Sequence, residues 1–365
     1  MTELRLIADD LTGALDSAAA FASVIGPQRV VWQEGQAGSV FNTGTREVSE
    51  ADAARRLHRL ALFLAPAPDR LGFFKVDSLL RGHAGVELAA VLGQVPFDHV
   101  IIAPAIPFQG RVTRQGRQYA RVGDSWTVTG EDLAARLRGQ GYDVMTARAG
   151  DALPRGICLW DAETMDDLDA IVGAGRAARG RVLWVGAAGL AAALAGASGA
   201  VAVAPRAPLL GLIGTNHPIM RGQLAAVQAL SLARDEDVRG VVEDIEALLA
   251  SDGVAFVNAG LTDAADRGAV QAGILRRIAG VLGRVTRPGA LFVSGGETLS
   301  GVATALGAVA LDVFGVFEPG IPASRLIGGR WDGLTVFSKS GAFGAPDVLS
   351  RLVASLVPDS KETRP

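Results

Sequence analysis

The sequence predicts an α/β protein of two domains, each a mainly parallel sheet flanked by helices. Short apolar runs without alternation recur between Gly, Pro or Asp, which is typical of strands buried on both faces. Helical patterns lie between these runs, and strands that alternate with helices indicate α/β layers. The chain has 365 residues, which is long for a single core, so two domains are expected.

The expected strands fall into two sets. The first half of the chain contains six of the runs: Leu4–Ala8, Arg29–Trp32, Gly72–Val76, His99–Ala103, Ile157–Trp160 and Val182–Val185. The second half contains four more: Leu209–Gly214, Val254–Asn258, Ala290–Val293 and Leu334–Phe337. In open α/β sheets, ligands bind at the carboxyl ends of the strands, so functional residues are expected there.

The expected helices have an apolar stripe at helical spacing. Glu50–Leu64 is the clearest, with an arginine-rich face opposite the stripe. Gln223–Leu232 and Val270–Leu282 repeat the pattern. Two prolines precede a new strand near Pro205, which places the domain boundary there and predicts domains 1–204 and 205–365.

Composition excludes several classes of function. The net charge is −3 and no block of Lys or Arg occurs, so we expect no nucleic-acid partner and no anionic membrane surface. Val182–Ala204 lacks charge over a length that could cross a bilayer, but glycines interrupt it, and a strand, a turn and a small-residue helix explain it better. The one cysteine, Cys158, lies in an apolar run and is expected to be a buried structural thiol. No signal peptide is recognised, and a cytoplasmic location is expected.

The first candidate site is a pair of adjacent carboxylates, Asp9 and Asp10, at the end of the first strand. Asp16 follows about two helical turns later. A carboxylate here can orient hydroxyls, hold Mg²⁺ or accept a proton, but Asp also caps helices well. We expect one of the pair to cap the helix and the other to be functional, with Asp10 as the functional one. A phosphatase with an aspartyl nucleophile would need Asp-x-Asp after this strand, whereas the two acids here are adjacent.

Cations gather in the next motifs. The segment Lys75-Val76-Asp77-Ser78 and the nearby Arg81 leave a strand end, and Arg46 follows an earlier strand. Arg presents a fork that matches a carboxylate, and Lys presents a mobile charge, so an anionic substrate suits them. A surface ion pair of Asp77 with Lys75 or Arg81 is the alternative. Arg111 and Arg114 leave another strand through a two-proline loop, where a structural role is equally open.

Glycine turns dominate the second half. Three of them follow apolar runs and carry a hydroxyl or a lysine: Gly214-Thr215, Ser294-Gly295-Gly296-Glu297-Thr298 and Lys339-Ser340-Gly341. Glycines let a backbone approach a ligand, and a helix that opens at Glu297 would offer free N–H groups to a phosphate. A P-loop motif is absent. Each turn alone is also an ordinary connection, but three in one domain favour nucleotide binding.

Taken together, these motifs resemble the four-carbon acid sugar kinase family, whose members phosphorylate threonate, erythronate or 3-oxo-tetronate type acids. The ordered set runs nearly end to end: IADDLTGALD, KVDSLLRG, APAIPFQGR, VGAAGLAAAL, IGTNHPIMRGQ, SGGET, EPGIP and KSGAFG. KVDSLLRG is nearer to the threonate-type branch. Two positions depart from the family pattern: where Gly-Ser is expected, the chain has Gly214-Thr215 and Gly186-Ala187. The second half is also shorter than expected.

The resemblance implies an N-terminal acid-sugar domain, a C-terminal ATP domain and an active site in the cleft between them. It assigns the acid sugar to Asp10, Arg46, Lys75, Val76, Asp77, Ser78 and Arg81. It assigns the nucleotide to Thr215, Gly295, Gly296, Glu297, Thr298, Lys339, Ser340 and Gly341. The implied reaction transfers the γ-phosphate of ATP, with Mg²⁺, to a hydroxyl, expected to be the terminal 4-OH, with Asp10 or else Asp9 as base. The residues of a metal site stay unknown.

Two other functions remain open. A sugar-acid and nucleotide sensor without catalysis would keep the same fold, and the short second half motivates that alternative. A nicotinamide-dependent dehydrogenase would need Gly-x-Gly-x-x-Gly after the first strand, which is absent. A homodimer is compatible with the sequence, and no macromolecular partner other than a second copy is expected.

Overall fold

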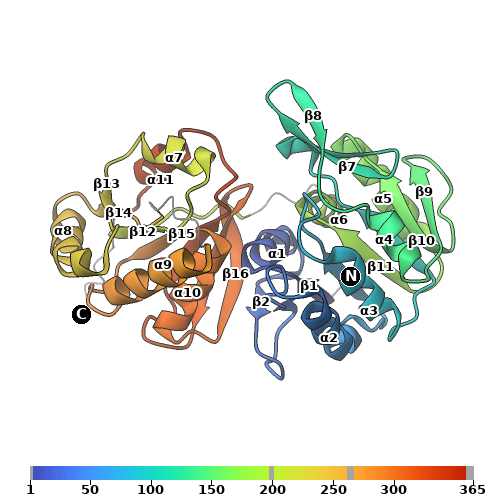
Figure 1. The fold of residues 1–365 in the computed structure, drawn as a ribbon, viewed down its shortest axis with the longest axis horizontal. Helices are drawn as coiled ribbons and strands as arrows, with labels where there is room; N and C mark the ends of the chain where they lie inside the picture. Colours follow the sequence, from blue (N-terminus) through green and yellow to red (C-terminus); the bar gives the residue numbers. More distant parts are fainter. Residues whose placement is uncertain (1–2, 197–200, 261–266, 359–365) are drawn as a thin grey trace. The chain divides into compact units, whose positions relative to one another are not determined.

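The computed structural model describes residues 3–196, 201–260 and 267–358 of the chain. These residues divide into two compact units, an N-terminal unit (Met1–Ala200) and a C-terminal unit (Val201–Pro365), coloured blue to green and yellow to red in Figure 1. Ala202 and Arg206 bridge to Val316 and Val357, so the residues around the predicted boundary pair with the C-terminal unit.

The sheet of the N-terminal unit is parallel throughout. Its order is β2-β3-β1-β4-β11-β5-β10-β9. The bounds are β1 (Glu3–Ala8), β2 (Gln28–Val31), β3 (Val40–Asn42), β4 (Arg70–Lys75), β5 (His99–Ala103), β9 (Val144–Arg148), β10 (Gly156–Asp161) and β11 (Val182–Gly186).

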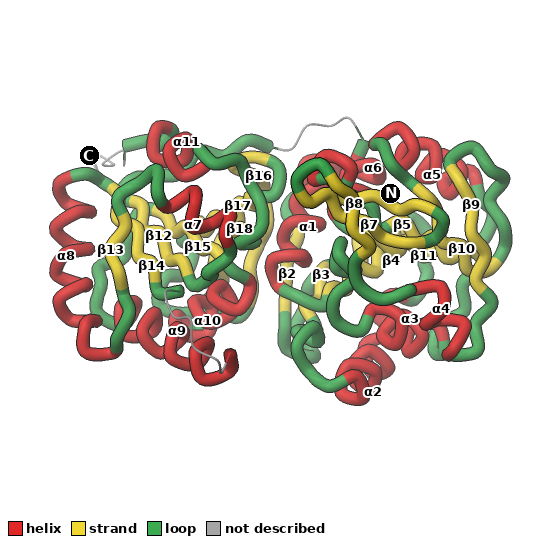
Figure 2. Tube along the Cα trace, turned by 45° about the horizontal axis from the view of Figure 1, so that its top comes forward, coloured by secondary structure: helices red, strands yellow, loops and turns green. Residues whose placement is uncertain are grey.

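Helices cover this sheet in two groups, which Figure 2 shows on its opposite sides. One group is α1 (Leu11–Ile25), α5 (Met165–Ala177) and α6 (Ala188–Ala195); the other is α2 (Glu50–Leu60), α3 (Ala84–Leu92) and α4 (Leu133–Gly139). The chain runs from β1 out to the edge strand β2 and then returns to β4 on the other side of β1. This change of direction makes the carboxyl ends of β1 and β4 a topological switch point, the place where such sheets bind ligands.

The C-terminal unit repeats this arrangement. Its sheet has the order β13-β14-β12-β15-β18-β17-β16, in which β16–β17 and β17–β18 pair antiparallel and the other pairs are parallel. Its strands are β12 (Leu209–Ile213), β13 (Ala229–Ser231), β14 (Val254–Asn258), β15 (Ala290–Ser294), β16 (Ala310–Glu318), β17 (Ile321–Ile327) and β18 (Thr335–Lys339). Its helices are α7 (Pro218–Leu224), α8 (Val238–Ser251), α9 (Arg267–Leu282), α10 (Gly296–Leu306) and α11 (Val348–Ala354). The switch point here lies between β12 and β15.

A separate three-stranded antiparallel sheet forms an arm on the N-terminal unit. It consists of β6 (Arg111–Arg114), β7 (Arg117–Val122) and β8 (Ser125–Val128). Figure 1 shows the β7–β8 hairpin extending away from the main sheet. The turn before the arm is a short 3₁₀ helix, Pro107–Gln109, which closes the predicted two-proline loop.

The predicted fold class is confirmed in its sheets and helices. All ten expected strands are present, because most of them are apolar runs that are buried on both faces. The helix predicted at Gln223–Leu232 is wrong: α7 begins at Pro218, a residue favoured in the first turn, and β13 occupies Ala229–Ser231. Cys158 is buried, as predicted, and burial raises its pKa to about 12. Within the described ranges, no helix is long and apolar enough to cross a membrane.

Candidate active site

Asp9 and Arg46 form a buried ion pair at the switch point of the N-terminal unit. Asp9 follows β1, and its side chain is 5% exposed. Arg46 donates from Nε to Asp9 Oδ2 at 2.7 Å and from a terminal nitrogen to Oδ1 at 2.8 Å, which is the two-pronged geometry of a strong pair. Burial raises the pKa of Asp9 against the opposing charge of Arg46, and the charge of Asp10 adds to the rise.

Asp10 caps helix α1. Its Oδ1 accepts from the backbone N–H of Gly13 at 3.0 Å and from Arg46 at 2.8 Å, and the Thr12 hydroxyl donates to its Oδ2 at 2.5 Å. Of the two adjacent carboxylates, the one that caps the helix is therefore Asp10, the residue expected to be the functional one. Its side chain stays 17% exposed, so a ligand can still reach it.

Asp77 organises the turn after β4. It accepts from Arg81 at 2.7 and 2.9 Å, and from the backbone N–H groups of Leu79 and Arg81. Although burial acts to raise the pKa of Asp77, Arg81 and Arg46 overcome it and hold the pKa below its usual range. The ion pair of Asp77 with Arg81 thus exists, with Asp77 buried and the Arg81 side chain 57% exposed. The part of the guanidinium that does not bind Asp77 can meet an anion.

Lys75 brings a buried ammonium to the start of α1. Its Nζ donates to the carbonyl of Val76 at 2.8 Å, and the side chain is buried. A Cβ atom on Gly13 would lie 2.9 Å from this Nζ and 2.4 Å from Asp10 Oδ1. Glycine at position 13 is therefore what lets the ammonium approach the helix end.

The arm holds the turn that contains Ser78. Arg111, the first residue of β6, donates to the Ser78 hydroxyl. Gln118 on β7 donates to the Ser78 carbonyl at 2.8 Å, and the Thr113 hydroxyl donates to Gln118. We call the group Asp9, Asp10, Arg46, Lys75, Asp77, Arg81 and Arg111 the charged cluster.

Two further carboxylates face the charged cluster. Glu87 on α3 is buried and hydrogen-bonded to Thr45; burial raises its pKa to about 7, and the charge of Asp9 adds to the rise. Glu87 lies in a helix that is apolar by sequence, and no signal in that sequence marks it. Asp16 on α1 is partly exposed, and burial raises its pKa to about 6 against the charges of Lys75 and Arg111.

The glycine turns of the C-terminal unit gather at its own switch point. Gly214 follows β12, and Gly295 follows β15 with φ of +110°, a conformation that favours glycine. A Cβ on Gly214 would lie 2.1 Å from the Thr298 hydroxyl oxygen, and a Cβ on Gly295 would lie 3.0 Å from it. The two turns are therefore in direct contact around Thr298.

Helix α10 begins at Gly296, one residue before the predicted start, and places Glu297 in its first turn. Its N-cap, Gly295, supplies no side-chain hydrogen bond. The N-terminal backbone N–H groups of an 11-residue helix are thus available to an anion, as the sequence predicts for a phosphate.

The third turn meets the first. A Cβ on Gly341 would lie 2.5 Å from Thr215 Oγ1 and 2.8 Å from its Cγ2, so only glycine fits there. The Thr215 hydroxyl accepts a hydrogen bond from the backbone N–H of His217 at 3.3 Å. Thr215, Gly295, Thr298 and Gly341 thus come together.

Lys339 has a different environment from the one expected of a phosphate ligand. It is 1% exposed, and its Nζ donates to the carbonyls of Ser340 and Phe343 at 3.0 and 2.8 Å. Gln223 on α7 donates to the carbonyls of Phe343, Gly344 and Ala345. Burial lowers the pKa of Lys339 to about 8, with Glu318 opposing. Lys339 therefore shapes the loop at 340–345 from beneath.

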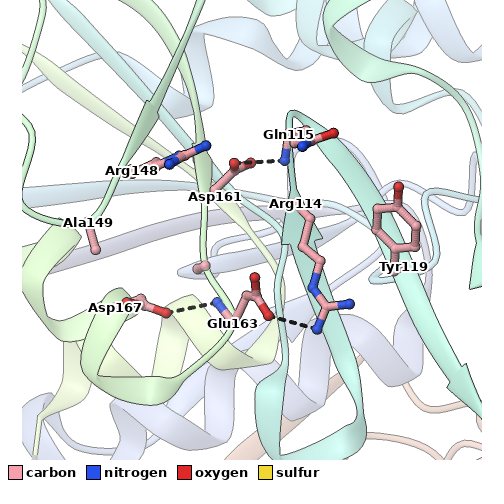
Figure 3. Close-up of a pocket in the computed structure, with 9 residues that line it drawn as sticks. Arg114, Gln115, Tyr119, Arg148, Ala149, Asp161, Glu163 and Asp167 are labelled. Carbon is pink, nitrogen blue, oxygen red and sulfur yellow. Dashed lines mark hydrogen bonds and ion pairs between the residues drawn. The ribbon is translucent and has the colours of Figure 1, made fainter. Parts of the chain in front are cut away.

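A separate pocket of about 660 Å³ lies at the carboxyl ends of β9 and β10 (Figure 3). Its carboxylates have structural partners: Asp161 accepts from the backbone N–H groups of Gln115 and Gly116, and Asp167 caps α5. Arg114 pairs with Glu163 at 2.7 Å. Arg114 thus lies here, outside the charged cluster.

Comparison with known proteins finds a separate family match in each of the two units. Residues 4–138 match a family described as a sugar-binding N-terminal domain, and residues 210–349 match one described as a nucleotide-binding C-terminal domain. The N-terminal match contains the charged cluster, and the C-terminal match contains the glycine turns.

Full-length relatives agree with both matches. D-threonate kinases of Cupriavidus necator and Bordetella bronchiseptica are each 29% identical; the alignments cover 94% of this chain and 95% of the first, and 97% of this chain and 97% of the second. A 3-oxo-tetronate kinase of Pseudomonas savastanoi pv. phaseolicola is 24% identical over 97% of both chains.

Among solved structures, a protein of Salmonella typhimurium LT2 shares the fold with a TM-score of 0.76 and 18% identity, over 96% of this chain and 98% of that one. One of Haemophilus influenzae has a TM-score of 0.69 and 20% identity, over 96% and 99%. The family matches thus describe a protein with a sugar-binding N-terminal domain and a nucleotide-binding C-terminal domain. The chain belongs to the four-carbon acid sugar kinase family.

Proposed function

We propose that the protein transfers the γ-phosphate of ATP to a hydroxyl of a four-carbon sugar acid such as threonate or erythronate. The charged cluster carries the proposal, because it brings several cations to the switch point of a sugar-binding domain. Arg81 pairs with Asp77 through Nε and one terminal nitrogen, and its exposed side chain leaves the other terminal nitrogen for the substrate carboxylate. Lys75 supplies an ammonium beside the α1 N-terminus. Asp10 orients the attacking hydroxyl, which we assign to the terminal 4-OH.

The nucleotide is proposed to bind the glycine turns of the C-terminal unit. Gly295 and Gly341 leave space that a Cβ would fill, and the α10 N-terminus, which has no side-chain cap, directs its first backbone N–H groups toward the place proposed for a phosphate. Thr215 and Thr298 add hydroxyls. Lys339 holds the carbonyls of the loop at 340–345, which is proposed to form the remaining edge of the nucleotide site. Lys339 therefore acts as a positioning residue.

Mg²⁺ is proposed to arrive with ATP. The described residues contain no group of three or more His, Cys, Asp or Glu side chains that could hold a metal. Kinase Mg²⁺ needs only one or two carboxylates besides the phosphates, and Glu297 in the first turn of α10 fits that requirement. Bound there, the ion would neutralise phosphate charge, and transfer would rest on positioning rather than covalent catalysis.

A coupled ADP-release assay with D-threonate, D-erythronate, L-threonate and glycerate tests the proposal. We expect ADP release that depends on one four-carbon acid and exceeds the background hydrolysis of ATP. If no acid stimulates release while ADP still raises the melting temperature, the sensor alternative replaces the kinase. The predicted cleft between the domains, the predicted homodimer and the cytoplasmic location stay predictions.

A further inference from the structure

Asp16 is a carboxylate beside the charged cluster that has no hydrogen bond or ion pair among the described residues. It lies in the second turn of α1, on the stripe of the helix that includes Gly13, Ala20 and Ser23. Residues of this stripe are partly exposed, while the helix positions between them are buried. Asp16 is therefore within reach of a ligand that enters beside Gly13.

The other carboxylates of the charged cluster are occupied. Both oxygens of Asp9 accept from Arg46. Asp10 is engaged on both oxygens by Gly13, Thr12 and Arg46, and Asp77 by Arg81 and the backbone of its own turn. A substrate hydroxyl would therefore share these carboxylates with hydrogen bonds that they already accept.

The charges around Asp16 suit a base that works near neutral pH. Burial raises its pKa to about 6, Lys75 on β4 and Arg111 on β6 favour the ionised form, and Asp10 opposes it. Helix α6, packed beside α1, contributes only Gly, Ala and Leu. Asp16 is thus ionised at pH 7 yet more basic than an ordinary aspartate, which is the compromise that general-base catalysis needs.

A purely structural role leaves these features unexplained. Asp16 lies inside the helix, where it caps nothing, and aspartate has a low helix propensity. A half-buried carboxylate without a partner costs stability, so a ligand group is the natural partner for it.

Building on the proposed function, we propose that Asp16 is the general base of the reaction, while Asp10 orients the hydroxyl. The hydroxyl oxygen attacks Pγ, the new O–P bond forms as the bond from Pγ to the β,γ-bridging oxygen breaks, and ADP leaves with the electron pair. The hydroxyl proton passes to a carboxylate oxygen of Asp16 and then to solvent. Lys75 lies against the same substrate.

Asp16→Asn tests this assignment, with Asp143→Asn, an exposed aspartate of the same unit, as the matched control. With ATP and the acid that the wild type phosphorylates, we expect kcat of Asp16→Asn to fall about 10²-fold or more, with KM changed less than about threefold. The wild-type kcat should fall below about pH 6, and this acidic limb should be missing from the residual activity of Asp16→Asn. Asp16→Glu should recover part of the rate, and Asp143→Asn should behave as the wild type.

The competing outcome is equally definite. A folded Asp16→Asn protein that keeps kcat within about fivefold, or that keeps the acidic limb, removes Asp16 from the base role, and an Asp10→Asn protein that loses the limb instead would transfer the role to Asp10. A rise in KM without a fall in kcat would make Asp16 a binding residue. If the wild type phosphorylates no acid, the proposed function fails first and the base role falls with it.

Discussion

Arg46 holds Asp9 through two hydrogen bonds of 2.7 and 2.8 Å, and the pair joins the end of β1 to the segment after β3. The same guanidinium contacts Asp10 at 2.8 Å and lies 3.5 Å from Asp77. Burial acts to lower the pKa of Arg46, but the three carboxylates outweigh it and raise that pKa. One cation therefore fixes three acids that come from two different strand ends.

Arg46→Ala should strongly destabilise the N-terminal unit, because Asp9 then stays buried without its partner. Breaking a buried pair from one side costs about 3–5 kcal/mol. Urea unfolding measures this loss, and the double variant Arg46→Met with Asp9→Asn should recover much of it. A single variant within about 1 kcal/mol of the wild type would show that the pair contributes little.

Glu87→Gln should flatten the dependence of stability on pH. The folded-state pKa of Glu87 is raised from 4.5 to about 7, so its contribution is complete below about pH 4.5 and is lost as pH rises through 7. Wild-type Tm should therefore fall between pH 5.5 and 8, and less so in Glu87→Gln, which keeps a hydrogen-bonding group but cannot ionise. Asp9 and Asp16 shift in the same direction, so some slope should remain.

Thermal melts at four pH values in this range give the comparison. A unit of this size changes Tm by about 2–4 °C for each kcal/mol. Parallel curves for the two proteins would mean that Glu87 has an ordinary pKa.

Gly341→Ala should weaken nucleotide binding. The added methyl would meet all three non-backbone atoms of Thr215, so side-chain rotation cannot relieve the contact, and strain of about 1–3 kcal/mol is expected. The rise in Tm produced by ADP should shrink or vanish. Gly240→Ala is the matched control, since a Cβ on this exposed glycine of α8 meets nothing within 4 Å and should leave the ADP response intact. If ADP raised Tm equally in both variants, the turns at Thr215 and at Gly341 would not belong to the nucleotide site.

Lys339→Met should loosen the loop at 340–345 without unfolding the unit. It removes two hydrogen bonds to carbonyls, but it also removes a buried charge, so the two effects on stability partly cancel. Hydrogen exchange at the loop amides and ADP affinity measure the outcome. We expect faster exchange and weaker ADP binding. Gln223→Ala should have the same effect, because it removes the other side chain that donates to the carbonyls of this loop. Unchanged exchange with lost activity would instead make Lys339 a phosphate ligand.

Buried strands were predictable from sequence because an uninterrupted apolar run leaves few alternatives. His99–Ala103 and Val254–Asn258 match to the residue. The β7–β8 hairpin and the short β13 escaped prediction, since partly exposed strands carry no such run. Residues at the strand ends were also predictable, because the sheet brings those ends together.

What each site residue contacts was harder to predict. That Asp10 caps α1 while Asp9 pairs with Arg46 depends on backbone geometry between adjacent residues. Lys339 sits in a motif with glycines, yet its direction into the interior depends on the loop carbonyls that follow. Glu87 lies within an apolar helix, and the burial and the charge of Asp9 that raise its pKa depend on how this helix packs.

The contacts of the arm with the Ser78 turn have a consequence for how the protein can change. Arg111 and Gln118 fix the hydroxyl and the carbonyl of Ser78 from strands that are 33 and 40 residues further along the chain. A substitution in β6 or β7 can therefore shift the substrate-facing turn by a fraction of an ångström while leaving every cation in place. Selection for a different acid therefore has an indirect route here, through strands that lie outside the β1 and β4 ends.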